Sequence, residues 1–118
     1  MQGNIKVEIQ NIGSGEIKLV KIIGELDVIS ADSFKQTVGS YIDGGFINLI
    51  FDLENLRFID SIGNLSLVNV YMNAKRKKGE VKFFGINENI KEVLSVIGTA
   101  KIIPIYESLE EALLDFKK

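Results

Sequence analysis

The sequence contains no cysteine and no histidine, and these two absences exclude several kinds of site. Without cysteine, the chain can form neither a disulfide nor a zinc–thiolate centre. Without histidine, it cannot build a Ser-His-Asp or Cys-His catalytic arrangement, and most transition-metal sites are excluded as well. No plausible nucleophile–base pair remains. We therefore expect that the chain is not an enzyme and that it uses no metal or cofactor.

A strong charge of one sign and long hydrophobic runs are also missing. The 118 residues carry 14 basic and 16 acidic side chains, whereas a nucleic-acid-binding domain usually presents a strongly basic face. No apolar run approaches the ~20 residues that span a bilayer. Residues 1–4 lack the basic and apolar regions of a signal peptide. These features predict a cytoplasmic protein that neither binds nucleic acid nor inserts into a membrane.

Strand and helix patterns alternate along a chain of single-domain length, residues 1–118. Period-two alternation over residues 5–10, a turn near Gly13 and an apolar stretch over 18–23 predict a hairpin. Further strands are expected over 47–53, 81–86 and 101–106, and helices over 34–43, after Ser61, after Asn87 and after Ser108. Alternating strands and helices favour parallel pairing through right-handed crossovers. The predicted fold class is α/β, with a central mixed sheet of about four to five strands flanked by about four helices.

The most informative segment is Phe58–Gly63, where an Asp60-Ser61 pair follows a strand and stands at the start of a helix. Unpaired backbone N–H groups and the helix dipole favour an anion at such a position. Ser61 is therefore either a plain N-cap or a place for a phosphate. Asp60 could equally be the cap, with Ser61 in the first turn. The residues alone leave these alternatives open.

The helix after Ser61 is unusually apolar, which predicts that its own core, a partner or both cover most of it. Its narrow polar stripe consists of Ser66, Asn69, Asn73, Arg76 and Lys77. Two pairs of strand-end carboxylates could in principle flank a glycosidic bond or hold a metal. These are Glu25 with Asp27 and Asp52 with Glu54. Turns and caps at strand ends explain both pairs more simply.

Four blocks, in order along the chain, together resemble the STAS domain of bacterial anti-sigma factor antagonists. The blocks are 24–27, 51–56, 58–63 and 98–113, so that the resemblance covers nearly the whole chain. It implies a STAS-like fold with Ser61 as the phosphoacceptor and Asp27 and Asp60 near it. It also implies the partners. The unmodified form would bind an anti-sigma factor that is also a serine kinase, phosphorylation would dissociate the complex, and a serine phosphatase would reset it.

The chain departs from the family pattern next to the acceptor. Ile62 stands where the family often has Ser or Thr, and Asn64-Leu65 follows Gly63 where Leu-Gly is usual. These positions belong to the surface expected to touch the kinase. We also expect three small polar residues to face the partner beside Ser61, namely Asn64, Asn69 and Asn73.

Two other functions remain open at this point. The first is a STAS scaffold or adaptor, in a signalling assembly or a lipid-transport complex, with Ser61 unmodified; Ile62 and Asn64 favour it. The second is a small nucleotide-binding or hydrolytic domain, although neither a GxGxxG nor a P-loop pattern is present.

Overall fold

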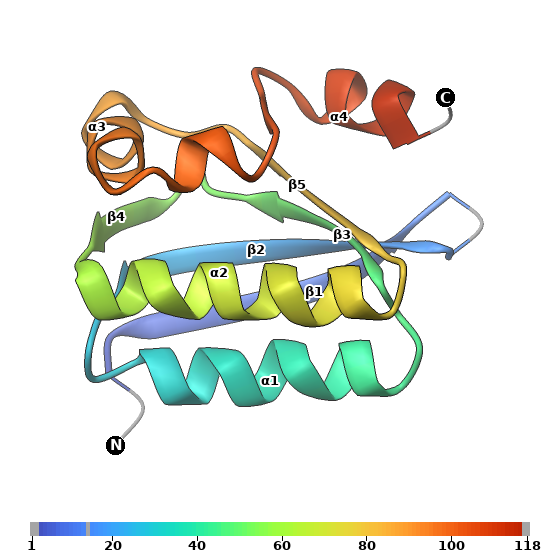
Figure 1. Ribbon diagram of the computed structural model, residues 1–118, viewed down its shortest axis with the longest axis horizontal. Coiled ribbons are helices and arrows are strands. Elements are labelled where there is room, and N and C mark those ends of the chain that lie inside the picture. Colours follow the sequence, from blue (N-terminus) through green and yellow to red (C-terminus); the bar gives the residue numbers. More distant parts are fainter. Residues whose placement is uncertain (1–2, 14, 117–118) are drawn as a thin grey trace.

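A mixed sheet runs through the centre of the computed structural model, which describes residues 3–13 and 15–116 (Figure 1). Its strands follow the spatial order β1-β2-β3-β5-β6, and β4 continues the sheet by pairing with the end of β2. β1 and β2 form the antiparallel hairpin, and the other pairs are parallel. The strands are β1 Ile5–Ile12, β2 Ile17–Leu26, β3 Asn48–Asp52, β4 Leu56–Ile59, β5 Glu80–Phe84 and β6 Ile105–Tyr106.

Helices cover both faces of this sheet (Figure 1). They are α1 Ala31–Asp43, α2 Ser61–Arg76, α3 Glu88–Ile97 and α4 Leu109–Phe116. The first three pack on one large core, where the ring of Phe51 meets Phe34 edge-on and stacks on Phe83. α4 covers a smaller cluster on the opposite face. In the described part of the chain, no helix is long and apolar enough to span a bilayer.

Local signals in the sequence place several helix ends correctly. The Asn87 side chain accepts a hydrogen bond from the Ile90 N–H (3.0 Å), so it caps α3 as predicted. Gly98 ends that helix with φ of 99°, a left-handed conformation that glycine adopts without strain. Ser108 accepts from the Glu111 N–H at 3.1 Å and begins α4. Residue Ser14 of the predicted turn and residues 1–2 and 117–118 lie outside the described residues.

The sheet differs from the expectation at its two short strands. The described residues form six strands rather than four to five, because the extended segment before Asp60 pairs with β2 as β4. The last predicted strand, 101–106, is reduced to β6. Its first part is taken up by a 3₁₀ turn at Thr99–Lys101, whose Thr99 carbonyl accepts from the N–H groups of Ile102 and Ile103. Pro104 has no N–H to give to a sheet.

Candidate functional site

Ser61 is the first residue of α2, and Asp60 is its N-cap. The Gly63 N–H donates to Asp60 Oδ1 at 2.8 Å, and the Asn64 N–H donates to the Asp60 carbonyl at 2.9 Å. Ser61 is exposed. Within residues 3–13 and 15–116, no hydrogen bond ties its hydroxyl to another group. The Ser61 hydroxyl therefore does not cap the helix, and it lies at the positive end of the helix dipole without a hydrogen bond to the described residues.

The two aspartates expected near Ser61 lie at the ends of neighbouring parallel strands. β2 and β4 pair through Leu26 and Ile59, so that Asp27 and Asp60 leave the same edge of the sheet. Asp60 Oδ2 accepts from the Val28 N–H at 3.0 Å and so joins the β2–α1 loop to the start of α2. The structure thus brings Asp27, Asp60 and Ser61 to one edge.

Asp27 shapes the loop that leads into α1. Its Oδ1 accepts from the N–H groups of Ile29 (3.0 Å) and Ser30 (3.1 Å). The Ser30 hydroxyl completes the turn by donating to the Glu25 carbonyl at 2.8 Å. Both aspartates therefore stabilise the local structure through hydrogen bonds within the chain, and this role does not require a partner protein.

Exposed apolar side chains lie on the β2–α1 loop and at the start of α2, beside Ser61. Ile62 and Leu65 occupy positions that the sequence places on the kinase-facing surface, whereas Val28 and Ile29 were not predicted. Val28 and Leu65 are 65% and 59% exposed, and Ile29 and Ile62 are also exposed. From Ile62 a hollow of about 570 Å³ continues between α1 and α2. Its lining combines apolar and cationic side chains, including Leu65, Val68, Met72, Lys35 and Arg76. The sequence signal for this surface was the excess of apolar residues in α2. A helix that is apolar on all sides is expected to be covered both by its own core and by a second element or partner.

Three expectations about the polar residues of α2 have different outcomes. Asn69 is exposed and lines the hollow, whereas Asn73 is half-buried and accepts from Arg76 at 3.0 Å. The expectation that Asn64 faces a partner is wrong, because its side chain is 2% exposed and accepts a hydrogen bond from the Thr99 hydroxyl. Ser66 is also buried and does not belong to the exposed polar stripe.

Gly63 is a packing position rather than a contact surface. It is buried, and a Cβ added there would lie 1.9 Å from the Leu26 carbonyl oxygen. Only glycine lets α2 begin this close to the end of β2. Gly63 thus supports the switch neighbourhood by positioning Ser61, and it presents no side chain to a partner.

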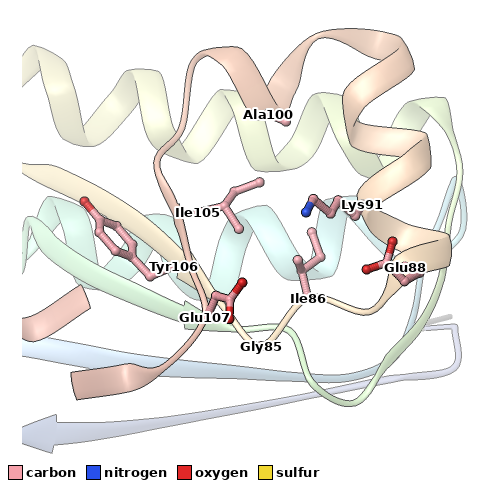
Figure 2. Close-up of a pocket in the computed structure, with 8 residues that line it drawn as sticks. All are labelled: Gly85, Ile86, Glu88, Lys91, Ala100, Ile105, Tyr106 and Glu107. Atoms are coloured by element: carbon pink, nitrogen blue, oxygen red, sulfur yellow. The ribbon is translucent and has the colours of Figure 1, made fainter. Parts of the chain in front are cut away.

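A second hollow, of about 470 Å³, lies at the carboxyl ends of β5 and β6. Figure 2 shows Glu88 and Lys91 of α3 on one side and Tyr106 and Glu107 on the other. Two carboxylates and a single ammonium suit a polyphosphate poorly, because like charges repel at close range. Among the described residues, no group of three or more acidic side chains is placed to hold a metal ion. The surface around Ser61 is therefore the better candidate site.

A family model for the STAS domain matches residues 8–112. The chain belongs to the STAS domain family. An anti-sigma F factor antagonist of Paenibacillus polymyxa is 26% identical over 115 residues, 97% of each chain. A crystal structure of an anti-sigma factor antagonist from Mycobacterium paratuberculosis superimposes with a TM-score of 0.85 at 21% identity, over 97% of this chain and 95% of that one.

A third similar protein is a Bacillus protein whose structure was solved in the phosphorylated form. This cell fate determinant, SpoIIAA, superimposes with a TM-score of 0.73 at 18% identity, over 96% of this chain and 100% of that one. At such identities the superpositions establish a common STAS fold.

Proposed function

We propose that this protein is an anti-sigma factor antagonist that binds an anti-sigma factor and releases it when Ser61 is phosphorylated. The observation that carries the proposal is the Ser61 hydroxyl, which is exposed, unpaired among the described residues and placed at a helix start. The name of the Paenibacillus relative supports the same role. On this proposal the partner is also the serine kinase, a serine phosphatase resets the switch in the cytoplasm, and the antagonist itself has no catalytic residue.

The unmodified protein would bind through the apolar residues around Ser61. Val28, Ile29, Ile62 and Leu65 are exposed, and burying apolar surface contributes about 25 cal/mol per Å². Asn69 would contribute a hydrogen bond at lower desolvation cost than a charged residue. Ser61 would lie inside this contact, where the kinase can reach its hydroxyl.

Phosphorylation would weaken this contact through charge. A phosphoserine adds about −1.5 to −2 charge at pH 7, and the start of α2 tolerates that charge within the free protein. In a desolvated interface the same charge lies beside Asp60 and near Asp27, which repel it. Changing a complex from 99:1 bound to 1:99 requires ~5.5 kcal/mol of differential affinity. Repulsion, desolvation and the loss of close apolar contact all act in that direction.

An adaptor role, with Ser61 left unmodified, is the second candidate function. The observation that favours it is that Ile62 and Leu65 are exposed directly beside Ser61. Ile62 replaces the hydroxyl residue that the family often has there. A contact through these apolar side chains could be permanent, and it would not require phosphorylation of Ser61.

Titration calorimetry against the purified anti-sigma partner separates these two functions. Ser61→Ala should fold, bind like the wild type and resist phosphorylation by the kinase. Ser61→Asp should also fold, because an anion suits a helix start, yet it should bind at least about tenfold more weakly, equivalent to 1.4 kcal/mol. Equal affinities of all three proteins would contradict the switch and favour the adaptor role.

A second pair of variants tests the position of the contact surface. Asn69→Glu places a charge in the hollow between α1 and α2 and should weaken binding, while the melting temperature stays nearly unchanged because Asn69 is exposed. Gln10→Glu adds the same charge on the exposed side of β1 and serves as the control. A similar loss of affinity in both variants would place the contact elsewhere.

A further inference from the structure

β1 is the outer strand of the sheet, and half of its backbone groups face outward without a partner in the described part of the chain. It pairs with β2 in an unbroken antiparallel register from Ile5↔Gly24 to Ile12↔Ile17, with no bulge. Edge strands of this kind are usually protected by charged side chains, proline, bulges or a covering element, and β1 carries the charged residues Lys6 and Glu8. Residues 5–12 contain no proline and no glycine.

The hydrogen bonds around β2 determine which residues of β1 face outward. The Glu25 N–H donates to the Asn4 carbonyl at 2.8 Å, whereas the Gly24 N–H turns the other way and donates to Asn55 at 3.0 Å. Because this orientation alternates along an antiparallel pair, the even-numbered residues of β1 bond to β2. The N–H and C=O groups of Ile5, Val7 and Ile9 therefore point away from the sheet. Within the described chain, no other element forms a hydrogen bond with them.

Charges on β1 select one way of pairing it with a copy of itself. The side chains of Lys6 and Glu8 have 70% and 42% of their surface accessible and form an ion pair of 3.2 Å within the strand. If a two-fold axis passes through Val7, Lys6 of each copy faces Glu8 of the other. Ile5 then faces Ile9, and the outward backbone groups of these residues pair. Moving the axis to position 6 sets Lys6 against Lys6, and moving it to position 8 sets Glu8 against Glu8.

From this pattern we infer that β1 is a self-association edge, which joins two copies of the chain into a continuous sheet through an antiparallel β1–β1 pair centred on Val7. The occupant is a second copy because the strand is complementary to itself in charge at that register. Opposite charges that face each other across an antiparallel pair are stabilising, and like charges are destabilising. The half-buried side chain of Val7 would pack against Val7 of the other copy, and those of Ile5 and Ile9 against Ile9 and Ile5.

The first test measures mass in solution by sedimentation equilibrium up to about 1 mM protein, where an interface with a millimolar Kd is substantially populated. The wild type should show a reversible dimer. Val7→Pro removes an N–H that points outward, so it should abolish the dimer while the monomer still folds, as proline is tolerated on the free side of an edge strand. A wild type that stays monomeric over this range would overturn the proposal.

Charge reversal provides a test that does not depend on proline. Lys6→Glu and Glu8→Lys each place like charges opposite one another and should weaken dimerisation at least about fivefold. The double variant Lys6→Glu/Glu8→Lys restores opposite charges in both copies and should recover the wild-type dimer. A double variant as weak as the single variants would contradict the register.

Engineered cysteines test the position of the two-fold axis, because the chain has no cysteine of its own. In the Val7→Cys variant the two introduced thiols would face each other, within the roughly 4.4–6.8 Å between Cα atoms that a disulfide requires, and should cross-link on mild oxidation. Ile9→Cys is the matched control. In the proposed register position 9 of each copy faces Ile5 of the other, so this variant should cross-link far more slowly. Faster cross-linking at position 9 would overturn the Val7-centred pairing.

Discussion

At the scale of single residues, Asp60 links folding to the candidate site. One carboxylate oxygen caps α2 through Gly63, the other holds the β2–α1 loop through Val28, and the carbonyl accepts from Asn64. The hydroxyl of Ser61, the next residue, makes no hydrogen bond within residues 3–13 and 15–116. On the proposed function, folding and switching would therefore depend on two adjacent side chains.

Substitution of Asp60 should accordingly reduce stability, whereas substitution of Ser61 should not. Asp60→Ala loses a cap and a loop contact, and we expect a cost of about 1–3 kcal/mol in the free energy of unfolding. Asp60→Asn keeps an oxygen for the cap and should cost less. Ser61→Ala should stay within about 0.5 kcal/mol of the wild type. Urea unfolding of the four proteins checks this, and an equal loss for Asp60→Ala and Ser61→Ala would contradict the assignment of the cap.

At the scale of elements, β5, β6 and α4 are held together by a small polar cluster in an apolar setting. Lys82 is buried, lies 4.8 Å from the centre of the Phe116 ring and pairs with Asp115 at 3.3 Å. The Tyr106 hydroxyl donates to the same carboxylate. Burial, and then this hydrogen bond, raise the pKa of Tyr106 from 10.0 to about 12.

This shift predicts a loss of stability at alkaline pH. Below about pH 10 the phenol is protonated in both the folded and unfolded chains. Between pH 10 and the folded value of about 12 the unfolded chain loses the proton first, so the stability that Tyr106 contributes declines. The difference in unfolding free energy between wild type and Tyr106→Phe should shrink from pH 9 to about pH 11. A difference that is constant with pH would show that the hydroxyl does not couple to folding.

At the scale of the whole molecule, one sheet separates two cores of unequal size. The large core lies under α1, α2 and α3, and the small one under α4 involves Leu19, Ile50, Phe84 and Ala112 as its buried members. α4 has eight residues, which is too short for an isolated helix to be stable in water. Its stability therefore depends on the small cluster and on the contacts of Asp115.

Because the core under α4 is the smaller one, we expect the region around α4 to open locally before the whole molecule unfolds. Amide hydrogen exchange followed by mass spectrometry should show α4 exchanging with a lower opening free energy than β3, which is covered on both faces. Tyr106→Phe should accelerate exchange in α4 and leave β3 nearly unchanged. Equal protection of α4 and β3 would mean that the two cores open as one unit.

Much of the fold could be predicted from the sequence because its signals are local. The caps at Asn87 and Ser108, the stop at Gly98 and the period-two hairpin each depend on residues within a few positions of one another. The length of the last strand was predicted wrongly, because only Ile105–Tyr106 of the expected 101–106 form a strand. There the Thr99 carbonyl and Pro104 act against a stretch whose composition favours a strand.

The sequence by itself determined the order of strands and helices, the α/β class and the exclusion of histidine and cysteine chemistry, because these follow from composition and short-range periodicity. Only the tertiary structure decided which side of α2 is covered. Asn64 is buried because Thr99, 35 residues away, supplies its hydrogen bond. Ile62 and Leu65 remain exposed because no element packs over them in the described chain. Burial is decided by contacts between distant segments, and local polarity does not encode those contacts.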